Sequence, residues 1–202
     1  MDKELLLKIV DKLGWVLDKM QKSDIENERK DSKLRARYAE YYVASKLSDI
    51  YKVNIKSGFR GADIILDNKI KIEVKSGEYN ENGGEFSFGK GAQISDLSEI
   101  DPYFNYCVCV AFPESGGSKI IETLIFTLEN LQEIKKPRGK NLVRNISTNS
   151  CILIRNYTKV SYYKDSKGER IHEEDVRQVE LDIIKHPSKY VNRWDKIARA
   201  RV

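Results

Sequence analysis

The chain has 202 residues, of which 40% are hydrophobic and 33% are charged, and its formal net charge is +5. This composition excludes a mainly disordered chain, and the lack of any run of about 18 uncharged apolar residues excludes a membrane-spanning helix. Because the first residues also lack the pattern of a secretory signal, the sequence predicts a single cytoplasmic domain over 1–202.

The predicted elements begin with two helices. Apolar residues at helical spacing predict an amphipathic helix over 3–20 and a second helix over about 34–49. Between them, 21–33 is polar and highly charged, which is typical of a linker or of a solvated helical extension. We therefore expect an N-terminal helical extension over 1–33, followed by a core over 34–112.

A β region fills the rest of that core. Asp67-Asn68 favours a tight hairpin turn between two short strands, and 106–112 is apolar almost throughout, as in a strand buried on both faces. The Gly-rich stretch 77–91 is predicted to be a loop. The remaining elements expected here are strands at 51–56, 63–66 and 70–76, and a short helix at 93–100.

The last part of the chain, 113–202, is expected to hold further strands and basic helices. The run 135–144 contains several cations, a proline and a glycine but no acid, so it is predicted to be a loop that contacts phosphate. The other elements expected here are strands at 120–128, 151–154 and 161–163, and helices at 173–185 and 188–199.

Charge is distributed unevenly along the chain. Acids dominate the middle, 61–134, and bases dominate 1–60 and 135–202. An acidic centre between basic ends fits a metal site framed by surfaces that hold a polyanion. The alternative interpretation is an ordinary solvated surface.

The few cysteines and histidines and their positions exclude several kinds of active site. Cys107, Cys109 and Cys151 lie in apolar runs and are expected to be buried, reduced thiols. The chain has two histidines, neither near a nucleophile motif, and no phosphate loop of Walker or dinucleotide type. Any catalysis must therefore depend on carboxylates and lysines.

One hairpin concentrates such residues. In the strand Ile70–Lys75, Glu73 and Lys75 are two apart and share one face, and a turn at Asp67-Asn68 would bring Asp63 beside Glu73. Two converging carboxylates make a hard-oxygen site suited to Mg²⁺ or Mn²⁺, with a lysine to orient the attacking water. The alternative is an exposed hairpin with surface ion pairs, each worth little.

Asp63 followed by Glu73-Val74-Lys75 resembles the catalytic core of the PD-(D/E)xK nuclease superfamily, although Ala62 stands in place of the motif's proline. The resemblance implies an α/β restriction-endonuclease-like fold, a mixed central sheet flanked by helices, with extra N- and C-terminal helices. It also implies roles for individual residues. Asp63, Glu73 and the Val74 carbonyl would hold the metal, Lys75 would position the water, and Glu40 would assist at a second metal.

The resemblance further implies an activity: Mg²⁺- or Mn²⁺-dependent hydrolysis of DNA phosphodiester bonds by a homodimer that needs no nucleotide cofactor, with restriction or host defence as its setting. A Holliday-junction-resolvase-like enzyme, a catalytically inactive DNA-binding protein and an unrelated α/β protein remain open alternatives. The residues expected to contact DNA are Arg60, Lys90, Gln93, Lys135, Lys136, Arg138, Lys140 and Arg144.

Overall fold

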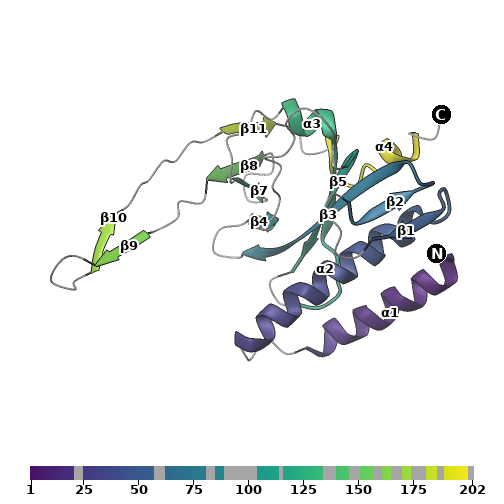
Figure 1. Cartoon of the computed structure of the whole chain (residues 1–202), viewed down its shortest axis with the longest axis horizontal. Coiled ribbons are helices and arrows are strands. Elements are labelled where there is room, and N and C mark those ends of the chain that lie inside the picture. The colour runs from purple at the N-terminus through teal and green to yellow at the C-terminus, as the bar shows by residue number, and fades with distance from the viewer. Residues whose placement is uncertain are drawn as a thin grey trace.

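The fold is known from a computed structural model (Figure 1). It describes residues 1–20, 25–56, 62–80, 85–88, 104–113, 116–133, 140–145, 151–156, 161–164, 170–173, 181–185 and 189–199. No helix in these ranges is long and apolar enough to cross a membrane.

Within the described ranges, nine strands form one mixed sheet whose longest path runs β1-β2-β3-β4-β7-β8-β11. From β3 the sheet also branches to β5, which is parallel to it, and then to β6. The strands are β1 (Val53–Ile55), β2 (Ile64–Leu66), β3 (Ile70–Asn80), β4 (Glu85–Phe88), β5 (Tyr106–Phe112), β6 (Glu122–Thr127), β7 (Lys140–Asn145), β8 (Cys151–Asn156) and β11 (Leu181–Lys185).

Helices flank this sheet. The helices α1 (Lys3–Lys19) and α2 (Ile25–Leu47) lie side by side against one face of the sheet (Figure 1). Two short helices complete the set: α3 (Leu128–Glu133) follows β6, and α4 (Asp195–Ala198) is the last described element. The predicted α/β class, with a mixed central sheet flanked by helices, is confirmed. Two more strands, β9 (Ser161–Lys164) and β10 (Arg170–Glu173), pair with each other in a separate ribbon.

The core divides between the two faces of the sheet. On the face that the long helices cover, Val108, Val110 and Phe112 of β5 pack with side chains of both helices, whereas Cys107 and Cys109 point to the opposite face. All of these side chains are buried, so the prediction of a central strand buried on both faces is confirmed for β5. Burial of each large apolar side chain stabilises the fold by about 1.5–3 kcal/mol.

The predicted loop over 77–91 is wrong where the structure describes it. β3 continues through Gly77 to Asn80, and β4 occupies Glu85–Phe88. Gly77 is opposite Phe88 on one side and Ala111 of β5 on the other, so backbone pairing on both edges outweighs the weak strand preference of glycine.

Three predictions after residue 133 are also wrong. Lys140–Asn145 is strand β7 and not loop, because it pairs with both β4 and β8. Leu181–Lys185, predicted as helix, is strand β11, with Ile184 opposite Ile152 of β8. Of the helix predicted over 188–199, only α4 forms, because the preceding backbone pairs with β6 instead.

The helix predicted from residue 34 begins earlier. α2 starts at Ile25, so the described part of 21–33 is a helical extension and not a linker. The helix predicted over 93–100 lies outside the described residues.

Candidate active site

The β2–β3 hairpin forms as the sequence predicts. Ile64 lies opposite Ile72 in the antiparallel register, and Asp63 immediately precedes β2. In the connection, Asp67 and Asn68 adopt the left-handed conformation, with φ of 48° and 59°. Asp and Asn tolerate this conformation better than most residues, and the turn chemistry therefore accounts for the hairpin.

In the part of the chain that the structure describes, the edge of β3 that faces β2 has a gap in its strand pairing. β2 pairs only as far as Ile72, whose carbonyl accepts a hydrogen bond from the Asp63 N–H at 2.9 Å, and β4 starts to pair at Gly77. The Asp63 side chain enters this gap, where its Oδ2 accepts a hydrogen bond from the Val74 N–H at 2.7 Å. Because the N–H and C=O of one strand residue face the same edge, the Val74 carbonyl also faces the gap.

Glu73 and Lys75 form an ion pair on one face of β3. Lys75 Nζ donates a hydrogen bond to Glu73 Oε1, and each side chain is only 20% exposed. Burial alone would lower the pKa of Lys75, but the negative charge of Glu73 and this hydrogen bond outweigh burial and raise that pKa. Lys75 is therefore protonated at neutral pH, so it can orient a water or steady negative charge but cannot act as a base.

The surroundings of Asp63 disfavour its charged form, whereas those of Lys75 favour its charged form. Burial and the neighbouring charge of Glu73 raise the pKa of Asp63 from 3.8 to about 7, even though the Val74 N–H favours the ionised form. Glu40 adds to the rise and Lys75 opposes it. The carboxylates thus carry more negative charge than Lys75 neutralises, which is the environment that a bound cation stabilises.

Glu40 approaches the same group from α2. Its side chain is 13% exposed, and its Oε2 accepts a hydrogen bond from Arg37 Nη1 at 2.7 Å. Burial raises the pKa of Glu40 while Arg37 lowers it, and the charges of Glu73 and Lys75 also act on it. The structure therefore brings together the four residues predicted as catalytic: Asp63 just before β2, Glu73 and Lys75 on β3, and Glu40 on α2.

Arg37 is a member of this group that the sequence reasoning missed. It lies one helical turn before Glu40, and the i, i+3 spacing of opposite charges was the available signal. Its side chain is 40% exposed, so the guanidinium both holds the Glu40 carboxylate and borders solvent at the site.

The donor atoms suit a hard cation. Asp63 Oδ1, Glu73 Oε2 and the Val74 carbonyl are the oxygen ligands that Mg²⁺ and Mn²⁺ prefer. Among the described residues, however, no three His, Cys, Asp or Glu side chains are grouped closely enough to hold a metal ion by themselves. A cation here would depend on the backbone carbonyl and on water, and Mg²⁺ usually retains several waters in protein sites.

The residues predicted to contact DNA are mostly beyond what the structure describes. Lys140 and Arg144 belong to β7, where Arg144 lies opposite Phe86 of β4, and only their backbone is described. The others lie outside the described residues: Arg60, Lys90, Gln93, Lys135, Lys136 and Arg138.

Comparisons with known proteins complete the description of the site. No family model matches the chain, and no curated protein matches it. Among solved structures, a bacterial homing endonuclease, I-Ssp6803I, is similar over 84% of this chain and 92% of its own, at 16% sequence identity and a TM-score of 0.45. At this level the similarity carries no functional argument, which has to come from the site residues.

Proposed function

We propose that this protein is a Mg²⁺-dependent DNA endonuclease of the PD-(D/E)xK type. One observation carries the proposal: the Asp63 carboxylate sits in the unpaired edge of β3, bound to the Val74 N–H and adjacent to the Glu73–Lys75 ion pair. An ordinary surface hairpin would expose these charges, whereas here a buried cluster keeps a carboxylate pKa far above its usual range.

Each residue of the site would have a different role in phosphodiester hydrolysis. Asp63, Glu73 and the Val74 carbonyl would hold the cation, which when bound activates water and neutralises charge on the phosphate. Lys75 would donate hydrogen bonds to the attacking water or to a phosphate oxygen, and Glu73 fixes the direction of its ammonium group. Glu40, held by Arg37, supplies a further acceptor on the α2 side.

The same proposal covers partners and setting. A duplex has two strands and one such centre cuts one of them, so we propose that the protein acts as a homodimer on DNA in the cytoplasm, in restriction or host defence, without a nucleotide cofactor. Light scattering of the purified protein, with and without duplex, measures the oligomeric state directly.

The test uses supercoiled plasmid, linear duplex and a four-way junction, each with Mg²⁺, Mn²⁺ or EDTA. The variants are Asp63→Ala and Lys75→Ala, and the matched control is Lys71→Ala, which removes the same charge as Lys75→Ala from the same face of β3. We expect metal-dependent cutting that falls by at least about 100-fold in the two site variants and persists in the control.

The other outcomes identify the alternatives. Preference for the four-way junction would indicate a resolvase-like enzyme. Salt-sensitive binding without cutting on any substrate would indicate an inactive DNA-binding protein of this fold. If the protein neither binds nor cuts any of these substrates, the proposal of a nuclease is refuted.

A further inference from the structure

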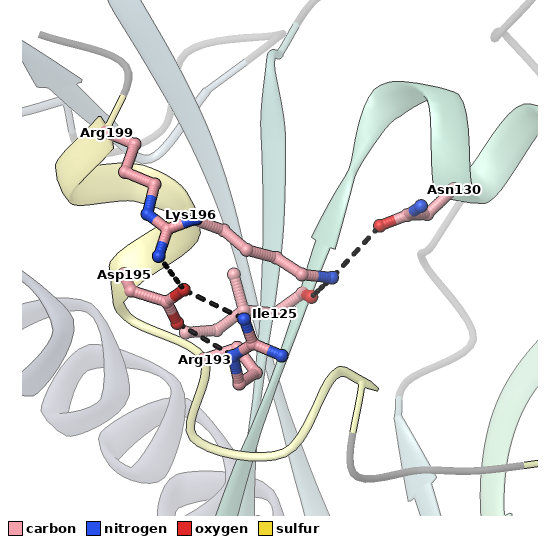
Figure 2. Close-up of polar contacts among 6 residues, drawn as sticks. All are labelled: Ile125, Asn130, Arg193, Asp195, Lys196 and Arg199. Atoms are coloured by element: carbon pink, nitrogen blue, oxygen red, sulfur yellow. Dashed lines mark hydrogen bonds and ion pairs between the residues drawn. The ribbon is translucent and has the colours of Figure 1, made fainter.

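A cluster of positive side chains near the C-terminal end of the described chain takes no part in the candidate active site. Arg193, Lys196 and Arg199 lie on or beside α4, and the Asp195 carboxylate pairs with the two arginines (Figure 2). Arg199 lies 3.7 Å from Asp195 Oδ2 and is 81% exposed. The cluster therefore carries three positive charges for one negative charge.

Asp195 fixes the orientation of Arg193. Arg193 Nε and Nη2 donate to the two oxygens of Asp195, each at 2.8 Å. The hydrogen bonds from Arg193 lower the pKa of Asp195 to about 2, so this pair is ionised at every working pH. A guanidinium held by two of its nitrogens leaves Nη1 as a preoriented donor for another acceptor.

Lys196 lies next to this arginine and is held by uncharged groups. Its Nζ is 3.2 Å from Asn130 Oδ1, 3.5 Å from the Ile125 carbonyl and 4.5 Å from the centre of the Tyr190 ring (Figure 2 shows the first two contacts). Burial and the positive charge of Arg193 lower the pKa of Lys196, although Asp195 opposes them. Two adjacent cations in this state are stabilised by an anion.

Asn130 adds a neutral donor to the pair. Its Oδ1 accepts from Lys196 and, at 3.3 Å, from the Thr127 N–H, while its own backbone N–H donates to Thr127 Oγ1. These contacts assign the oxygen of the amide, so its NH₂ remains available to donate. Polar side chains of α3, of α4 and of the segment before α4 thus lie on the outer side of β6 (Figure 2).

The cluster lies beyond the outer edge of β6, which β5 separates from β3. Val74 pairs with Val108, Val108 pairs with Ile125, and the Ile125 N–H donates to the Tyr190 carbonyl at 2.9 Å. Neighbouring strands lie about 4.8 Å apart, so β6 is roughly 10 Å from β3. Because Asp63 lies on the β2 side of β3 and the cluster lies outside β6, the two sites are farther apart than these backbones, by more than about three nucleotide steps of 3.4 Å along a duplex.

We propose that Arg193 and Lys196, assisted by Asn130, form a binding site for a phosphate group. This group is a backbone phosphate of the same DNA molecule that occupies the active site. The phosphate chemistry follows from the cluster alone. The assignment of its source to DNA rests on the proposed function.

The experiment compares Arg193→Gln and Lys196→Gln with Arg199→Gln as matched control. Each variant removes one positive charge from the same short segment, so a general effect of charge would be equal in all three. Binding of a short duplex is measured in EDTA over a series of salt concentrations. We expect the dissociation constant to rise about tenfold or more in the first two variants and about twofold in the control. The slope of log K against log salt should fall by about 0.9 in the first two only.

A second arm measures the melting temperature in inorganic phosphate against chloride at equal ionic strength. Phosphate should raise it for the wild type and for Arg199→Gln, and not for Arg193→Gln. The same melting curves show whether Lys196→Gln is folded. Should it not fold, Arg193→Gln, whose side chain lies at the surface, decides the comparison by itself.

The outcomes separate this proposal from the proposed function. Cutting of DNA by the wild type, with equal affinity and slope in all three variants, would overturn the phosphate site and leave the nuclease intact. Stabilisation by inorganic phosphate without duplex binding would overturn the nuclease and the DNA source, and would leave a site for free phosphate. No response in either arm would overturn both.

Discussion

Replacing Asp63 with asparagine should stabilise the metal-free protein in a pH-dependent manner. Burial and Glu73 raise the pKa of Asp63 from 3.8 to about 7 in the folded state. Since one pKa unit is worth about 1.36 kcal/mol, ionising Asp63 in the folded protein costs up to about 4 kcal/mol. Asparagine keeps an oxygen to accept from the Val74 N–H and carries no charge.

The sign of the effect follows from proton linkage. Between the unfolded pKa near 4 and the folded pKa near 7, the folded state binds the extra proton, so wild-type stability falls as pH rises through this window. Below it both states are protonated and the two proteins should be equally stable. Above it Asp63→Asn should be more stable by up to about 4 kcal/mol, an upper figure because the side chain keeps some contact with solvent.

Urea unfolding of both proteins in EDTA from pH 4 to pH 8.5 measures this difference. Addition of Mg²⁺ at pH 8 should then stabilise the wild type and leave Asp63→Asn unchanged, because a bound cation removes the repulsion that destabilises the carboxylates. A stability difference that is constant with pH would refute the reasoning, since an uncharged contact has no such dependence.

Three further perturbations test other contacts. Arg37→Gln should lower the rate of DNA cutting about tenfold and leave the affinity for duplex within about twofold, because the hydrogen bond from Arg37 holds the Glu40 carboxylate. Equal losses in kcat and in affinity would contradict this role. Glu78→Gln should destabilise the fold by about 1–3 kcal/mol in urea unfolding, because the nearly buried Arg35 loses its ion pair with Glu78 at 2.7 Å. An unchanged free energy of unfolding would show that other groups or solvent replace this ion pair. Ile72→Ala should cost about 2–5 kcal/mol by calorimetry, because Ile72 is fully buried; a smaller loss would mean that the core closes around the cavity.

The parts of the fold that the sequence predicted correctly are those set by local chemistry. Alternating β-branched residues and a turn made of Asp67 and Asn68 define the β2–β3 hairpin within thirteen residues. The approach of Asp63 to Glu73 then follows from the register alone. Alanines lie four residues before and after Glu40 on α2, and this spacing is consistent with its side chain being only 13% exposed.

The incorrect elements depend on partners distant in sequence. Gly77 is a poor strand residue that pairs on both sides with strands formed later in the chain, and Lys140–Asn145 has a loop-like composition that two neighbouring strands override. Arg37 was missed for a different reason. Ion pairs at helical spacing are common on surfaces, and only the burial of Glu40 distinguishes this one.

The gap in the pairing of β3 also divides the protein into two modules. Among the described residues, backbone pairing joins β4, β7, β8 and β11 to the rest of the sheet only at Gly77–Asn80, after the last residue of the motif, whereas β2, β5 and α2 support the motif itself. Substitutions in the outer four strands are therefore expected to leave the Asp63–Lys75 geometry unchanged as long as the pairing at Gly77–Asn80 is kept.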